Sequence, residues 1–363
     1  MNDFLETQAF LASRDVDGRY VNGKIIVPLL NSFGAIKIGE SVVKRSIHAI
    51  DMGNGPIKIL IWSQMHGNES TATKALFDAL CYLQENPLFL TPFTLKIIPM
   101  LNPDGAAAYT RANANSIDLN RDAINQSQPE SKLLVDIFHA FNPDYCFNLH
   151  DQRTIFGVNG NPCMLSFLSP AADEPKNITP HREKAMGVIG YIQNALQEHI
   201  PNQVGRYDDT FNPNCLGDFF TQQGTPTLLF EAGQVGQDYA RKETRKWYGF
   251  SILKALQCIS LNLYMLPIYH KIPEVEKSFV DVLIQNLTYQ ENQIDIALRY
   301  VEVLDGNQIN FIPVIHKMGK LDSLIGHRNI DVSNKTFHFV NTISIESNAV
   351  WLADLLNLTH YSH

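Results

Sequence analysis

A histidine and a glutamate three residues apart, His66 and Glu69, are the side chains best placed for chemistry. They follow residues 57–62, an apolar run that predicts a buried strand, and precede residues 70–82, whose apolar positions predict a helix. Ligands bind at such strand ends in open α/β sheets. Gly67 lets the backbone turn so that both side chains face one point, and imidazole and carboxylate are both zinc ligands. Taken alone, the pair is more often a solvated turn.

A second histidine, His150, ends another apolar run at residues 145–149, so it also lies at a predicted strand end. A catalytic zinc site usually has three protein ligands and one open position. His66, Glu69 and His150 would supply the two-histidine, one-carboxylate set of hydrolytic zinc enzymes. The alternative for His150 by itself is a core or loop histidine.

Five short motifs follow one another along the chain: HGNE at 66–69, NPDG at 102–105, DLNR at 118–121, His150, and Phe230-Glu231. In this order they resemble the motifs of the zinc carboxypeptidases of the carboxypeptidase A superfamily, over roughly residues 36–260. The resemblance implies an α/β fold with a mixed, largely parallel twisted sheet flanked by helices. It also implies one Zn²⁺ bound by His66, Glu69 and His150.

The resemblance assigns roles to polar residues between the ligands. Asn120 and Arg121 would hold the terminal carboxylate of the substrate, because guanidinium groups pair with carboxylates through two parallel hydrogen bonds. Arg111 would polarise the scissile carbonyl, and Asp118 would orient the first zinc histidine. Taken singly, each arginine is better explained as a solvated surface residue.

Glu231 ends the apolar strand predicted at residues 225–231, where an acid is costly unless it is paired or faces a cleft. The resemblance implies that Glu231 is the general base for the attacking water and then protonates the leaving amine. The alternative is a strand-end carboxylate in solvent. Tyr207 is the nearest candidate for the substrate-binding mobile tyrosine of the family, although its loop departs from the family pattern.

Periodicity and turn residues predict the elements that position these side chains. Further strands are expected at residues 24–28, 46–50 and 95–100, and a turn at 102–105 that shapes the site. Residues 154–180 are expected to form loops. Helices are expected at residues 4–13, 129–141, 181–199, 217–223 and 241–263.

The residue pattern of the sequence changes after Pro267. Strand patterns predominate there, and no catalytic motif follows. We therefore expect two domains, a zinc carboxypeptidase-like catalytic domain at 1–268 and a small β-rich C-terminal domain at 269–363. The predicted strands are 280–287, 297–304, 308–314 and 336–345.

Composition excludes several classes of function. The 363 residues are 45% hydrophobic, which allows a large core, and the net charge of −8 without a basic block argues against nucleic-acid binding. Five cysteines without a CxxC pair indicate neither a cysteine zinc site nor a disulfide framework. No secretory signal or apolar run of eighteen residues is visible, so we expect a cytoplasmic protein that does not bind membranes.

These observations favour a zinc-dependent hydrolase that uses zinc-activated water to cleave a C-terminal residue from a peptide or peptide-like substrate. The alternative is an N-acyl amino acid amidohydrolase resembling the aspartoacylase and succinylglutamate desuccinylase branch, which shares the zinc motif and the glutamate. Arg111, Asn120, Arg121 and the NPDG turn favour the peptidase. A binding protein that keeps the fold is a third hypothesis, against which the intact ligand set and Glu231 argue.

Overall fold

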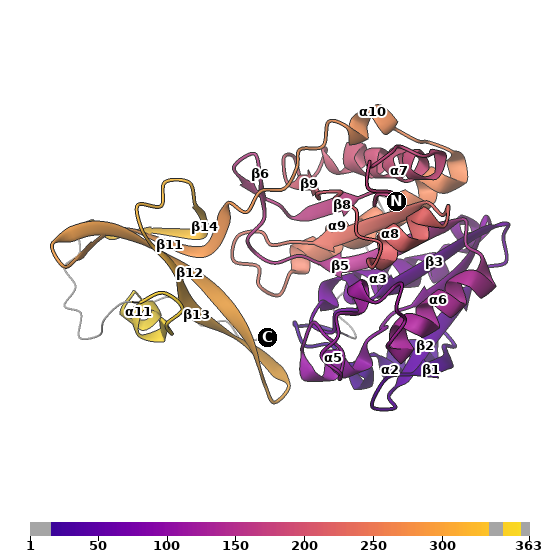
Figure 1. The fold of residues 1–363 in the computed structure, drawn as a ribbon, viewed down its shortest axis with the longest axis horizontal. Coiled ribbons are helices and arrows are strands. Elements are labelled where there is room, and N and C mark those ends of the chain that lie inside the picture. Colours follow the sequence, from indigo (N-terminus) through magenta and orange to yellow (C-terminus); the bar gives the residue numbers. More distant parts are fainter. Residues whose placement is uncertain (1–15, 334–343, 357–363) are drawn as a thin grey trace.

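The computed structural model describes residues 16–333 and 344–356, which form a helix-covered mixed sheet and a smaller second sheet (Figure 1). The large sheet has the strand order β1-β2-β4-β3-β5-β10-β8-β9, and its central strands β4, β3, β5 and β10 are parallel. The predicted fold class is confirmed. The strands are β1 Ile36–Glu40, β2 Ser46–Met52, β3 Ile57–Ser63, β4 Phe93–Ile98, β5 Tyr145–Asp151, β8 Leu165–Leu168, β9 Val204–Arg206 and β10 Thr227–Ala232.

Helices cover both faces of this sheet. On one face α3, α7 and α9 pack against one another, and on the other lie α6 and α8. Alternate residues of β3 enter the two cores: Ile59 and Ile61 contact the first, and Leu60 and Trp62 the second. The five helices are α3 Ser70–Glu85, α6 Pro129–Phe141, α7 Pro180–Leu196, α8 Leu216–Gln222 and α9 Lys242–Leu261.

Residues 24–28 form part of a helix, so the predicted strand there is wrong. Helix α2, Gly23–Ser32, begins at Asn22, whose side-chain oxygen accepts hydrogen bonds from the backbone N–H groups of Lys24 and Ile25. Its buried residues Ile26, Leu29 and Leu30 recur at helical spacing. The cap and this spacing outweigh the β-branched residues that suggested a strand. The helix predicted at residues 4–13 lies outside the described residues.

Two other local predictions are wrong, one because of a helix cap and one because of strand pairing. The NPDG segment starts helix α5, Pro103–Ala108, with Asn102 as its cap, and is not a plain turn. The segment expected to be loops contains β8, which is fully enclosed and pairs with β10. The remaining short elements are α4 Pro87–Leu90, α10 Leu266–Tyr269, β6 Gly157–Val158, β7 Asn161–Pro162 and the 3₁₀ turn η1 Leu119–Arg121.

The second sheet has the order β13-β12-β11-β14 and its own apolar core, which includes residues of α11, Val350–Leu355. In Figure 1 it projects from the helix-covered part as a long, orange hairpin-rich sheet. It begins at Phe279, and the predicted boundary after residue 268 stays a prediction. Sequence patterns missed β14, and most of the strand predicted at 336–345 lies outside the described residues. The strands are β11 Phe279–Tyr289, β12 Asn292–Asp305, β13 Gln308–Gly319 and β14 Ile325–Asp331.

Among the described residues, no helix combines the length and the apolar character needed to cross a membrane.

Candidate active site

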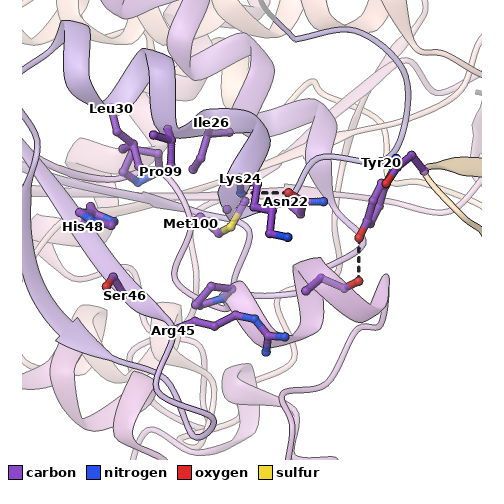
Figure 2. Close-up of a pocket in the computed structure, with 15 residues that line it drawn as sticks. Tyr20, Asn22, Lys24, Ile26, Leu30, Arg45, Ser46, His48, Pro99 and Met100 are labelled. Atoms are coloured by element: carbon purple, nitrogen blue, oxygen red, sulfur yellow. Dashed lines mark hydrogen bonds between the residues drawn. The ribbon is translucent and has the colours of Figure 1, made fainter.

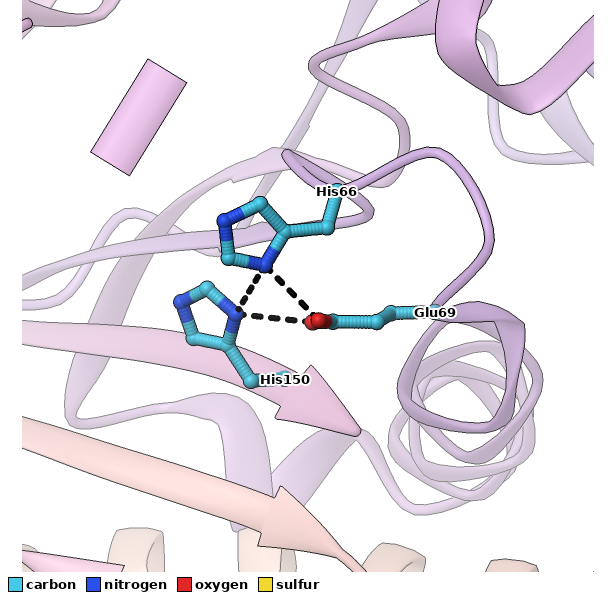
Figure 3. A group of neighbouring side chains, drawn as sticks. All are labelled: His66, Glu69 and His150. Atoms are coloured by element: carbon cyan, nitrogen blue, oxygen red, sulfur yellow. Dashed lines mark hydrogen bonds and ion pairs between the residues drawn. The ribbon is translucent and has the colours of Figure 1, made fainter. Parts of the chain in front are cut away.

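Three buried side chains from two parts of the chain converge on one point (Figure 3). The Nδ1 atom of His66 lies 2.8 Å from Glu69 Oε1, and the Nδ1 atom of His150 lies 2.8 Å from Glu69 Oε2. The two Nδ1 atoms are 3.1 Å apart. The sequence predicts these three residues as one set, and the structure brings them together.

The donor set suits a zinc ion. Ligand atoms about 2.0–2.1 Å from a tetrahedral zinc lie about 3.4 Å from one another, close to the spacing of the two imidazole nitrogens. The two Nδ1 atoms are 3.1 Å apart, so they cannot both carry a proton. Both can direct a lone pair to a shared cation. Zinc sites with two histidines and one carboxylate leave a position for water or substrate.

The sheet and helix α3 hold the three side chains in place. His66 follows β3, Glu69 is the N-cap residue of α3, and His150 lies on β5, the neighbour of β3. Asp151 fixes the start of the helix, because its carboxylate accepts hydrogen bonds from the N–H groups of Thr71 and Ala72, both at 2.9 Å. Its own N–H donates to Glu69 Oε2 at 3.1 Å.

Asp118 connects the triad to the predicted substrate-binding loop. Its Oδ1 lies 3.0 Å from Nε2 of His66, the contact that the resemblance implies, and also accepts the N–H of Asn120. Burial opposes ionisation of Asp118, but the bond to His66 and the charge of Arg111 hold the pKa of Asp118 well below its usual range. One ionised carboxylate therefore orients both a histidine and the turn η1.

Burial and neighbouring charge shift the pKa values of the two histidines in opposite directions. Burial lowers the pKa of His66, but the charge of Glu69 and the bond to Asp118 outweigh it and raise that pKa above its ordinary value. Burial dominates for His150 and lowers its pKa, although Glu69 opposes the change. A cation bound between the rings would favour the neutral form of both histidines.

Glu231 lies beside the triad because of strand register. In the parallel pair β5–β10, Glu231 is aligned with His150. Its Oε2 atom is buried without a hydrogen-bond partner among the described residues. Burial and the negative charges of Glu69 and Asp151 raise the pKa of Glu231 well above its ordinary value. An unpartnered carboxylate oxygen next to the triad suits a group that exchanges protons with a bound water.

A cleft of about 590 Å³ contains all eight predicted site residues. Arg111 spans the triad and Asp118, with hydrogen bonds of 3.2 Å to Glu69 and 3.0 Å to Asp118. Asn120 accepts the N–H of Leu216 at 3.1 Å. The eight cleft residues are His66, Glu69, Arg111, Asn120, Arg121, His150, Tyr207 and Glu231. Their individual roles stay predictions.

Tyr207 follows β9 and lines the same cleft. Its N–H donates to the carbonyl of Phe167, and its ring packs 5.1 Å from that of Phe156. Burial and the charge of Glu231 raise the pKa of Tyr207, so its hydroxyl remains protonated at neutral pH. A protonated phenol can donate a hydrogen bond to a substrate in this cleft.

Several other charged cleft residues were missed by sequence reasoning. Arg19, Arg153, Arg241 and Glu302 line the cleft, and burial raises the pKa of Asp218, which also lines it, to about 6. Asp218 lies in the first turn of α8. Arg153 follows β5 closely, whereas Arg19, Arg241 and Glu302 carry no local signal because they reach the cleft through long-range folding.

A second cavity of about 510 Å³ lies between α2, β2 and α5 (Figure 2). Its wall is mainly apolar and includes Ile26, Leu30 and Met100, with Lys24 and Arg45 extending into the space. Arg45 is paired with Asp104 at 2.7 Å. This cavity contains none of the predicted site residues.

A comparison against known families agrees with the motif order, the sheet and the geometry of the triad. The family model described as zinc carboxypeptidase matches residues 32–278. The chain belongs to the zinc carboxypeptidase family. The match includes every predicted site residue and ends one residue before the second sheet begins.

Individual relatives of this zinc carboxypeptidase are distant. Carboxypeptidase 2 of Trichophyton tonsurans is 27% identical over 100 residues, which cover 26% of this chain and only 19% of that relative. A metallo-carboxypeptidase structure from Burkholderia cenocepacia is similar with a TM-score of 0.55 and 18% identity, covering 67% of this chain and 70% of that one. A Pseudomonas aeruginosa metallo-carboxypeptidase gives a TM-score of 0.54 at 18% identity, with the same coverage. These likenesses support the fold.

Proposed function

We propose that this zinc carboxypeptidase-family chain hydrolyses the C-terminal peptide bond of a peptide or peptide-like substrate. The observation that carries the proposal is the alignment of Glu231 with His150 beside the buried triad, in a cleft that also contains Asn120 and Arg121. The triad is proposed to hold zinc. When bound, zinc would supply a Lewis acid that polarises a carbonyl and acidifies a water.

The substrate is positioned by groups on one side of the triad. The guanidinium of Arg121, which is exposed and bonded to the carbonyl of Asn120 at 2.7 Å, lies ready to pair with a terminal carboxylate. The side chain of Asn120 is fixed by Leu216 and adds a polar contact. Recognition of the free carboxylate explains why cleavage would take place at the end of the chain.

Proton transfer is assigned to Glu231. In its ionised form the carboxylate takes a proton from the attacking water and then gives it to the nitrogen of the leaving residue. A divalent cation in the triad would lower the pKa of Glu231, which burial and neighbouring acids otherwise raise, and so supply the ionised base. Arg111, half exposed beside Glu69, would donate to the carbonyl oxygen as negative charge develops there.

A paired substrate assay tests the proposal against the N-acyl amino acid amidohydrolase alternative. Zinc-loaded protein is incubated with blocked dipeptides and tripeptides, with the same peptides as C-terminal amides, and with N-acetyl and N-succinyl amino acids. We expect release of the C-terminal amino acid from free-acid peptides and at least tenfold slower cleavage of the amides, because amidation removes the carboxylate. Turnover confined to acyl amino acids would contradict the peptidase assignment.

A further inference from the structure

The long β12–β13 hairpin extends from the C-terminal sheet toward the catalytic part (Figure 1). An apolar cluster joins this hairpin to the catalytic part: Ile309 and Phe311 of β13 pack with Tyr20, Tyr109 and Tyr239. The ring of Tyr239 lies 5.2 Å from that of Phe311. The docking brings Glu302 of β12 into the wall of the cleft.

Glu302 forms an ion pair with the buried Arg19. Its two carboxylate oxygens accept hydrogen bonds from one nitrogen of Arg19 at 3.1 and 3.2 Å. The hydroxyl of Tyr109 donates to the same carboxylate. The side chain of Arg19 is only 4% exposed, so without Glu302 its charge would be buried beside one more distant acid.

Arg19 connects Glu302 to the residue that supports the triad. A second guanidinium nitrogen of Arg19 lies 3.8 Å from Asp151 Oδ2 and donates to the hydroxyl of Thr71 at 3.3 Å. Asp151 in turn caps α3 and donates its N–H to Glu69 Oε2. A continuous path of contacts therefore runs from Glu302 of the C-terminal sheet to the carboxylate of the triad.

We propose that Glu302 is a positioning residue of the active site, which acts through Arg19 and Asp151 to hold Glu69 in its metal-binding orientation. The inference rests on the proposed function insofar as the triad binds zinc. Loss of the Glu302 charge would draw Arg19 toward Asp151, disturbing the backbone N–H of Asp151 that holds Glu69. It would also leave an extra positive charge near the metal site, which repels a divalent cation.

The proposed positioning role of Glu302 can be distinguished from a purely structural role in docking the two sheets. Docking has other polar contacts away from the cleft, such as the hydrogen bond of 2.9 Å from Tyr239 to Asp281. If Glu302 only docked the sheet, loss of either contact would have the same consequence for the triad. Tyr239→Phe is therefore the matched control, because it removes an interface hydrogen bond without touching Arg19.

The test measures zinc retention directly. Wild type, Glu302→Gln and Tyr239→Phe are loaded with one equivalent of zinc, and the transfer of zinc to a chromophoric chelator is followed. We expect Glu302→Gln to release zinc about tenfold faster, the lower end of the effect typical for groups that orient a ligand. Tyr239→Phe should release zinc at the wild-type rate even where its melting temperature is lower.

A second variant covers the risk that an unpaired Arg19 prevents folding. In Arg19→Met/Glu302→Met both charges are replaced by apolar groups, which buried ion pairs often tolerate. We expect a folded protein that still releases zinc about tenfold faster, because Asp151 has lost its contact with Arg19. Wild-type zinc retention in Glu302→Gln or in the double variant overturns the proposal, as does equal acceleration in Tyr239→Phe.

Activity separates this inference from the proposed function. At saturating zinc, Glu302→Gln should keep its KM, because Glu302 is not one of the proposed substrate-binding residues. It should lose kcat, because Glu69 would no longer be held in its metal-binding orientation. A wild-type protein that retains zinc but cleaves no substrate overturns the proposed function, while the zinc-release rates still decide the role of Glu302. A wild-type protein that binds no zinc overturns both.

Discussion

At the scale of single residues, the site depends on how neighbouring charges are balanced. Glu69 lies between two imidazoles and Arg111, so its charge is matched, whereas Glu231 faces Glu69 and Asp151 and its pKa is raised. Two carboxylates 162 residues apart in the chain thus have opposite environments within one cleft. These opposite environments suit Glu69 as a metal ligand and Glu231 as a proton carrier.

Replacing Glu231 by Gln tests this division of roles. The amide keeps the size of the side chain but cannot accept and return the proton, so we expect kcat to fall by about 10²–10⁴-fold. Zinc content and melting temperature should stay near wild type, because Glu231 is not one of the three converging residues. Steady-state kinetics and metal analysis on the same preparation measure both quantities.

Asp218→Asn provides the comparison for Glu231→Gln, because Asp218 is the other cleft carboxyl whose pKa is raised, to about 6. If Glu231 is the general base, kcat should fall more in Glu231→Gln than in Asp218→Asn. If Glu231→Gln retained wild-type rates and Asp218→Asn did not, the proton carrier would be Asp218.

The residues that the sequence could predict share a local signal. His66, His150 and Glu231 each end or follow an apolar run, and parallel strands bring such ends to one edge of the sheet. Arg19 and Glu302 have no such signal, because their pairing spans 283 residues and depends on how two sheets dock. Their place in the cleft follows only from the folded structure.

At the scale of elements, the loop that carries His66 is in direct contact with the start of α5. A Cβ atom at Gly67 would lie 1.9 Å from the backbone carbon of Gly105. Asn102 strengthens this contact, since its side chain caps α5 and donates to the carbonyl of Met65. The role of Gly67 is therefore close approach between backbones, and the sequence interpretation of a glycine needed for turning was incomplete.

Gly67→Ala should consequently damage the site through backbone displacement. The added methyl meets backbone atoms that cannot rotate away, so we expect destabilisation of about 1–3 kcal/mol or more and reduced zinc retention. Thermal unfolding and zinc titration measure these effects. Gly23→Ala is the control, because nothing lies within 4 Å of a Cβ there and the residue begins helix α2. Equal stability of the two variants would contradict the packing argument.

Helices and central strands were predictable where burial follows the period of the element. Helix α6 was predicted at its observed bounds because its apolar residues recur at helical spacing between a proline and an asparagine. Strand β8 was not, since it is a four-residue segment whose only strand evidence is its pairing with β10 and β9. Short elements defined by their neighbours lack a periodic pattern long enough to detect.

At the scale of the whole molecule, the two sheets have separate cores joined by a small aromatic contact. Two clusters of buried residues lie in the C-terminal sheet, and two others fill the faces of the catalytic sheet. The joining cluster has five buried residues, with Phe311 against Tyr239 and Tyr300. Because each part has its own core, weakening the junction should uncouple them without unfolding either.

Phe311→Ala tests this organisation. Removing a buried phenylalanine ring typically costs about 3–5 kcal/mol, and here the loss falls on the junction. We expect calorimetry to resolve two unfolding transitions, with the lower one belonging to the C-terminal sheet and visible through Trp351 fluorescence. Val301→Ala, an exposed change on β12, should leave the unfolding profile within about 0.5 kcal/mol of wild type. A single transition for Phe311→Ala, shifted as a whole, would show that both sheets unfold as one cooperative unit, because the junction would then be part of a shared core.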